Sequence, residues 1–143
     1  MRGSYGDALA SYINAVYLRP DIASLHVSVA QAVTRVGGDE SQAMGYLERA
    51  LQINPNEPSA HYEIGAIYLK KEMTDKAIRE FETSLKGRPD FGPAVLNLSL
   101  AYQRKGEIFM ARRVLETFLA QFGRQGAPYV AEIQARLTTL PKS

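Results

Sequence analysis

The chain has 143 residues, which is enough for a single domain with a continuous core. Its 45% hydrophobic and 22% charged residues exclude a disordered chain, and its net charge of +2 is too small to indicate nucleic acid or a membrane as the partner. The absence of cysteine excludes disulfides and cysteine-ligated metals. No apolar run approaches the ~18 residues of a membrane span, and no apolar leader opens the chain. We therefore expect a soluble protein and favour the cytoplasm.

The first segment of the chain has two interpretations. Met1-Arg2-Gly3-Ser4 is either an expression remnant or native sequence. The second interpretation is supported by Gly3 and Tyr5, which fit the repeat described below. Apolar residues at helical spacing predict a helix over residues 6–18, which stops before Pro20. A second helix is expected over residues 22–36, with Asp21 as its N-cap and Gly37-Gly38 as its end.

The remaining segments also predict helices, so the fold class is all-α. We expect these helices over residues 41–53, 59–71, 75–86, 93–105, 107–122 and about 128–140. Asn54-Pro55, Pro89, Gly106 and the stretch from Gly123 to Ala127 separate them. Pro128 is expected to open the last helix, which ends at Pro141.

Alanines within the expected helices and prolines between them recur at a fixed period. Ala8, Ala43, Ala77 and Ala111 differ by 35, 34 and 34 positions, and Pro20, Pro55 and Pro89 follow the same steps. Such a period predicts a solenoid of stacked antiparallel helix pairs. Small residues occupy one position in the first helix of each pair, where two helices cross closely: these are Ala30, Gly65 and Ser99.

These residues resemble the tetratricopeptide repeat family. The central unit matches the family pattern with His61, Ile64, Gly65, Tyr68, Ala77, Phe81, Ser84 and Pro89. The unit before it is strongest in its second helix, and the unit after it lacks the closing proline. The resemblance implies one domain over residues 1–143, folded as a right-handed solenoid. Residues 1–20 would be a half repeat, 21–57, 58–91 and 92–125 full repeats, and 126–143 a capping helix.

Little in the sequence indicates catalysis. His26 and His61 hold the same repeat position, where a bulky side chain packs against the partner helix, so we interpret them as structural. No acidic residue or cysteine accompanies them in a known metal motif. We expect no enzyme activity, no cofactor and no metal.

The other face of the first helices carries an apolar band with polar edges, which is typical of a site for a peptide or an amphipathic helix. We therefore expect a protein-interaction scaffold that binds its partner in a concave groove. A chaperone-tail clamp is excluded, because its positions hold Val27, Gln31, Glu63, Pro93 and Asn97. The residues expected to bind the partner are Val27, Gln31, Arg35, Tyr62, Ala66, Leu69, Lys70, Leu96, Asn97, Leu100 and Arg104.

Two features of the sequence, a set of basic residues and the first helix, each allow two interpretations. Arg35, Lys70 and Arg104 share one position at the end of the first helices, where they either stabilise the helix termini or attract an acidic partner. The helix over residues 6–18 has no preceding partner, so the alternative function is self-assembly through this edge. Its expected contact residues are Leu9, Tyr12, Ile13 and Val16. Nucleic acid is not expected as a partner, because aromatic residues are not regularly spaced on the expected surface.

Overall fold

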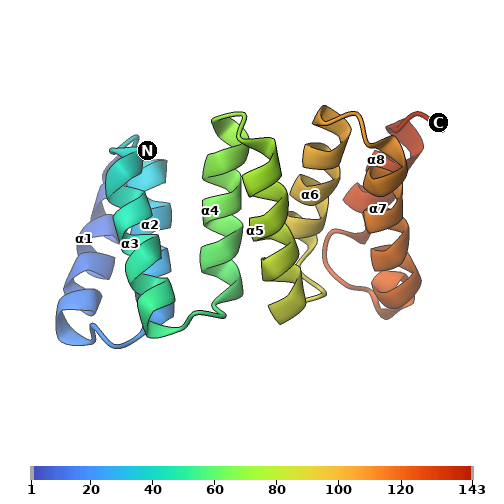
Figure 1. Cartoon of the computed structure of the whole chain (residues 1–143). Coiled ribbons are helices and arrows are strands. Elements are labelled where there is room, and N and C mark those ends of the chain that lie inside the picture. The colour runs from blue at the N-terminus through green and yellow to red at the C-terminus, as the bar shows by residue number, and fades with distance from the viewer. Residues whose placement is uncertain (1, 143) are drawn as a thin grey trace. The chain divides into compact units, whose positions relative to one another are not determined.

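The computed structural model describes residues 2–142 and is built from helices (Figure 1). The helices are α1 (Arg2–Leu18), α2 (Ala23–Arg35), α3 (Glu40–Ile53), α4 (Pro58–Lys70), α5 (Thr74–Gly87), α6 (Gly92–Arg104), α7 (Ile108–Phe122) and α8 (Val130–Thr139). A short 3₁₀ helix, η1 (Gly123–Gln125), follows α7. The described residues contain no strand, which confirms the all-α prediction. Met1 lies outside the described residues, whereas Arg2 to Ser4 belong to α1.

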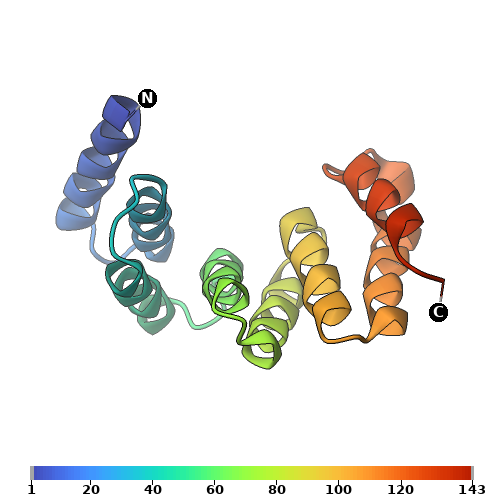
Figure 2. The ribbon, with the colours of Figure 1, turned by 90° about the horizontal axis from the view of Figure 1, so that it is seen from above.

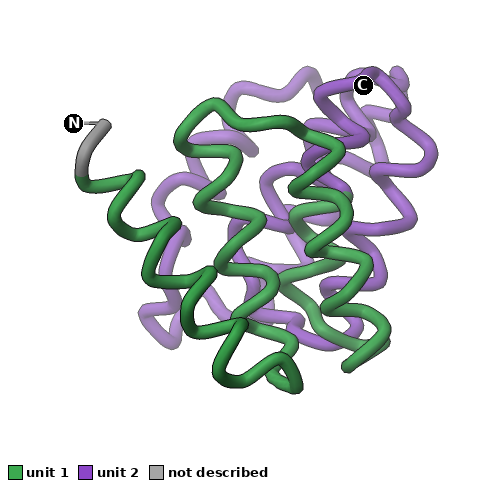
Figure 3. Tube along the Cα trace, turned by 90° about the vertical axis from the view of Figure 1, so that its left-hand side faces the viewer, with its two compact units in different colours: residues 1–64 green, residues 65–143 purple. Residues whose placement is uncertain are grey.

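The chain divides into two compact units, Met1–Ile64 and Gly65–Ser143, and the boundary falls within α4 (Figure 3). In the first unit, α2 packs against both α1 and α3 (Figure 2). Its core contains fully buried small and branched side chains, among them Val29, Ala30, Ala43 and Leu47. Because helices cover α2 on two sides, most of its circumference is buried.

In the second unit, α6 packs against both α5 and α7, and α8 packs against α6 and α7. Small side chains lie where these helices cross, as the repeat predicted. Ser99 and Ala111 are fully buried, and the Ser99 hydroxyl donates to the Ala111 carbonyl at 3.2 Å. The larger side chains of Phe81, Leu115 and Ile133 fill the space beside them.

The ends of the helices follow local chemistry. Asp39 caps α3, because its carboxylate accepts the Ser41 backbone N–H at 3.0 Å and the Ser41 hydroxyl at 2.9 Å. The backbone hydrogen bond is the main reason that the pKa of Asp39 is lowered. Asp21 does not cap α2 as expected: Ile22 holds the N-cap position, and the Asp21 carboxylate instead accepts two hydrogen bonds from Arg19, both at 3.0 Å.

The start of the last helix also differs from the prediction. The helix begins at Val130 rather than Pro128, because Tyr129 adopts a left-handed conformation with φ of 72°. The Tyr129 side chain covers Gly92: a Cβ atom on that glycine would lie 2.6 Å from Cβ of Tyr129. A tertiary contact with α6 therefore accompanies the delayed start of α8.

Candidate functional site: the first-helix surfaces

The first unit holds four of the expected partner-binding residues, and one of them is buried. Val27 is only 3% exposed, so its side chain is not available to a partner, contrary to expectation. The reason is that α1 and α3 both pack on α2 and leave little of its surface free. Gln31 and Tyr62 are half-buried, and Arg35 is exposed. These three residues remain candidates in this unit.

Gln31 is held by the carboxylate of Glu63, one of the residues whose presence excludes a chaperone-tail clamp. The Gln31 side-chain amide donates to the Glu63 carboxylate at 2.7 Å. Burial raises the pKa of Glu63, and the Gln31 hydrogen bond and the positive charge of Arg35 oppose that rise. Gln31 and Arg35 also line a narrow cavity of about 60 Å³ with Tyr5 and Tyr12 of α1. Side chains of α1 therefore lie beside this part of the expected surface.

The second unit places Leu96 in a hollow. A cavity of about 350 Å³ is lined by Leu96 of α6 together with Glu132, Ala135, Arg136 and Thr139 of α8. Asn97 and Leu100, which follow Leu96 on α6, are half-buried. The sequence analysis missed the α8 residues, because the capping helix lies outside the repeat pattern from which the surface was deduced.

The other expected partner-binding residues of the second unit differ from one another in exposure. Ala66 is half-buried and Lys70 is exposed. Leu69 is 6% exposed and belongs to the interior, contrary to the expectation that it contacts a partner. It lies in the last turn of α4, where its backbone carbonyl accepts the Arg104 guanidinium at 3.4 Å. Arg104, at the end of α6, thus meets the negative end of the dipole of another helix, α4, whereas the sequence predicted a contact with the end of its own helix.

The edge helix α1 exposes several large apolar side chains. Tyr12 and Ile13 are 38% and 43% exposed, whereas Leu9 and Val16 are half-buried. Tyr17 is 82% exposed and was not among the expected contact residues. Packing against α2 thus covers only part of the apolar surface of α1.

Each of the two histidines ties its helix to the preceding loop by a hydrogen bond. Nε2 of His26 donates to the Pro20 carbonyl at 2.9 Å, and Nε2 of His61 donates to the Pro55 carbonyl at 2.8 Å. Each bond joins a first helix to the proline that closes the preceding repeat. Nδ1 of His26 is buried and has no hydrogen-bond partner in the part of the chain that the structure describes.

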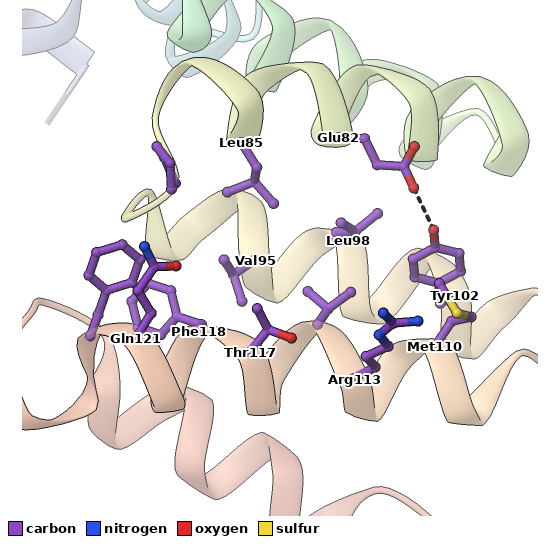
Figure 4. Close-up of a pocket in the computed structure, with 13 residues that line it drawn as sticks. Glu82, Leu85, Val95, Leu98, Tyr102, Met110, Arg113, Thr117, Phe118 and Gln121 are labelled. Atoms are coloured by element: carbon purple, nitrogen blue, oxygen red, sulfur yellow. Dashed lines mark hydrogen bonds between the residues drawn. The ribbon is translucent and has the colours of Figure 1, made fainter.

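A further cavity lies on the other side of α6 and was not predicted (Figure 4). It measures about 370 Å³, with Glu82 and Leu85 on α5, Val95 and Leu98 on α6, and further side chains on α7. The Tyr102 hydroxyl at one end donates to the Glu82 carboxylate at 2.5 Å. Burial and this hydrogen bond raise the pKa of Tyr102 above the ordinary value of a phenol.

Within each unit, successive helices pack as neighbouring antiparallel elements, and equivalent positions recur every 34 or 35 residues, as for Ala43 and Ala77. This arrangement defines a helical-repeat protein. No helix in residues 2–142 combines the length and apolar character needed to traverse a bilayer.

Comparison with known proteins specifies the family. A tetratricopeptide repeat model matches residues 46–79. A segment of 84 residues is 36% identical to the peroxisomal targeting signal receptor of Yarrowia lipolytica, and it covers 59% of this chain but 14% of the receptor. The crystal structure of MamA superposes with a TM-score of 0.71 at 27% identity, covering 85% of this chain and 70% of that one.

A thermophilic tetratricopeptide repeat protein from Thermus thermophilus shares the fold, with a TM-score of 0.78 at 22% identity over 96% of this chain and 73% of the other. Residues 46–79 thus match a tetratricopeptide repeat, and the fold of the chain is that of tetratricopeptide repeat proteins. Proteins of this family act as scaffolds for protein–protein interaction, and they are generally not catalysts.

Proposed function

We propose that this chain is an interaction scaffold whose second unit binds a peptide or an amphipathic helix between α6 and α8. The observation that carries the proposal is the hollow of about 350 Å³ beside Leu96. Leu96 provides an apolar surface, and Glu132 and Arg136 place opposite charges at its edge. An apolar floor with a charged rim suits a segment that buries one or two apolar side chains and keeps polar flanks in water.

The relatives support binding of a protein segment rather than a reaction. The receptor from Yarrowia lipolytica is, by its name, a receptor for a targeting signal. The receptor and this chain are similar over one segment only, so the name of the receptor does not identify the partner of this chain. The kind of partner must instead be inferred from the residues of the proposed surface. Half-buried Leu100 and Asn97 extend the proposed surface along α6. In the first unit, Gln31, Arg35 and Tyr62 form a separate set of candidate contacts, and in the second, Ala66 and Lys70 add to α6.

The proposal is tested by affinity capture with the whole chain, followed by mapping of the captured partner. Leu96→Ala with Leu100→Ala should abolish capture while helical content and melting stay close to wild type. Leu119→Ala is a matched control, because Leu119 is also half-buried but lies on α7, away from the hollow. Retention of the partner by the double variant would refute the proposed surface. The first-unit set is tested separately with Tyr62→Ala.

Self-assembly through α1 is the second candidate. It is favoured by the exposure of Tyr12, Ile13 and Tyr17 on one helix, because monomeric proteins rarely leave several large apolar side chains together in water. A second copy of the chain would cover these side chains. Sedimentation should then show association that grows with concentration, and Tyr12→Glu should abolish it. A single monomeric species at every concentration would refute this candidate.

A further inference from the structure

We infer that α1 pairs with α1 of a second copy of this chain, in antiparallel orientation about a two-fold axis. The inference rests on the self-assembly proposed above and specifies both the contact surface and the orientation of the pair. The contact surface is an exposed stripe along α1, formed by Gly6, Ala10, Ile13 and Tyr17. These residues are three or four positions apart, so they lie on one side of the helix.

The stripe on α1 differs in character from the same stripe on the other second helices. Ala8 aligns with Ala43 on α3, Ala77 on α5 and Ala111 on α7. This alignment gives the counterparts Ser41, Gly45, Glu48 and Gln52 on α3, Asp75, Arg79, Glu82 and Lys86 on α5, and Phe109, Arg113, Glu116 and Ala120 on α7. All of these counterparts are exposed, and most of them are polar or charged. The repeat therefore does not require apolar side chains at these positions, and on α1 they serve another contact.

The same comparison excludes a preceding first helix as the cover of this stripe. In the other repeats a first helix packs on the second helix, as α2 does on α3 and α6 does on α7. The counterparts Glu48 and Glu116 are nevertheless exposed. A helix placed against α1 in the same way would leave Ile13 and Tyr17 in water. The stripe itself carries no charge, so a second copy can cover it without burying an ionised group.

The sizes of the four residues make the stripe complementary to itself. Gly6 and Ala10 are small, whereas Ile13 and Tyr17 are large. Gly6 and Tyr17 lie equally far along the helix from the midpoint between Ala10 and Ile13. An antiparallel pair centred on this midpoint places each large side chain opposite a small residue of the other copy, as a two-fold axis requires. A parallel pair would instead place Tyr17 against Tyr17 and leave Gly6 opposite Gly6.

Gly6 is the residue that this pairing explains best. It lies within α1, where glycine costs about 1 kcal/mol relative to alanine. A Cβ atom on Gly6 would meet nothing within 4 Å among the described residues, so packing inside the chain does not require the glycine. The missing side chain leaves room beside the exposed helix backbone. The ring of Tyr17, which is 82% exposed, can occupy that room on a second copy.

The size of the contact predicts a weak dimer. A helix pair along α1, about 25 Å long, buries roughly 800 Å² over both copies, which is less than the ~1,200–2,000 Å² of a stable complex. Association must therefore be measured at high protein concentration. Sedimentation equilibrium of the whole chain should then show a dimer that dissociates on dilution.

Two matched glycine substitutions test the contact surface. Gly6→Leu fills the room opposite Tyr17 and should abolish the dimer, whereas Gly45→Leu, at the counterpart of Ala10 on α3, should leave it unchanged. Neither glycine has a neighbour within 4 Å of its Cβ position among the described residues, so both variants should keep the helical content of the wild type. Equal association of Gly6→Leu and wild type would overturn this contact and leave self-assembly itself standing. A wild type that stays monomeric, because another protein or none covers α1, would refute both.

Engineered disulfides test the orientation, and the absence of native cysteine makes them specific. Chains with Gly6→Cys mixed with chains with Tyr17→Cys should form a mixed disulfide on mild oxidation. Neither variant alone should form one, because an antiparallel pair holds the two copies of residue 6 about 16 Å apart along the axis, beyond the reach of a disulfide. Disulfides in each variant alone would indicate a parallel pair and overturn the inference. Absence of the mixed disulfide from a mixture that sediments as a dimer would overturn it as well.

Discussion

Gly65 of α4 packs directly against the ring of Phe81 in α5, so closely that a Cβ atom on the glycine would lie 2.7 Å from Cε1 of the ring. Phe81 is fully buried and cannot move aside without displacing its neighbours. We therefore expect Gly65→Ala to destabilise the protein, because overpacking of about 1–3 kcal/mol outweighs the gain of up to about 1 kcal/mol in helix propensity. Denaturant unfolding measures the difference.

Gly45 provides the matched control for this prediction. It lies within α3, and nothing is within 4 Å of the position that its Cβ atom would take. Gly45→Ala should therefore stabilise the protein by up to about 1 kcal/mol, since only helix propensity changes. If both substitutions changed stability in the same direction, close packing at Gly65 would not be the cause.

A second prediction concerns Glu72, which has a positive φ of 60°. Gly37 and Gly106 hold the equivalent turns of the other repeats and also have positive φ, of 73° and 86°. A side chain is strained in this conformation by about 1–2 kcal/mol, whereas glycine is not. Glu72→Gly should raise the free energy of unfolding by up to about 1 kcal/mol, and Gly106→Ala should lower it. A loss of stability in Glu72→Gly would show that the glutamate side chain matters more than the backbone.

The third prediction concerns the pH dependence of stability at Glu63. Burial raises its pKa in the folded state above the ordinary value of 4.5, so protonation favours folding. This favourable contribution is present below the ordinary pKa and is lost as the pH rises through the folded pKa. Glu63→Gln, which can still accept from Gln31, should therefore melt higher than wild type at neutral pH. The two proteins should converge in acid, and a constant difference at all pH values would contradict the prediction.

The fourth prediction separates the two roles of the basic residues. Arg104 donates to the Leu69 carbonyl at the end of α4, so Arg104→Gln should lower the free energy of unfolding by about 0.3–1 kcal/mol. If Arg35, Lys70 and Arg104 also attract an acidic partner, changing all three to glutamate should slow association at low salt and much less at high salt. Association rates with a captured partner, measured by stopped flow, decide this second part; an unchanged rate leaves only the role at the helix ends.

Much of the fold was predictable from the sequence, because the repeat combines helical periodicity with proline and glycine at fixed positions. The helix boundaries fall within a few residues of the expectation, apart from the earlier start of α1. The small residues at the crossings, such as Ser99 and Ala111, are buried as predicted. Two predicted helix starts were wrong, at Asp21 and near Tyr129, and the cause is similar. Asp21 binds Arg19 and Tyr129 packs on Gly92, and general capping preferences do not account for such specific contacts.

The candidate surface was less predictable than the fold. Spacing alone assigned Val27 and Leu69 to an exposed face, but both side chains are buried. Val27 lies on α2, which α1 and α3 cover on two sides. The sequence analysis did not predict the cavity between α5 and α7, because small side chains mark its position rather than a recognisable functional residue. Val95 is buried and Val114 is half-buried, and they hold the positions at which the first repeat carries the rings of His26 and Tyr46.

The hydrogen bonds from His26 to Pro20 and from His61 to Pro55 have a consequence for protein engineering. A designer who wished to lengthen the array would cut the gene between repeats and duplicate one cassette. A cut placed between the proline and the following first helix would separate the two partners of such a bond, so the imidazole of the inserted copy would face a loop from another repeat. A cassette of residues 20–54, which starts at the proline, keeps donor and acceptor together in every copy.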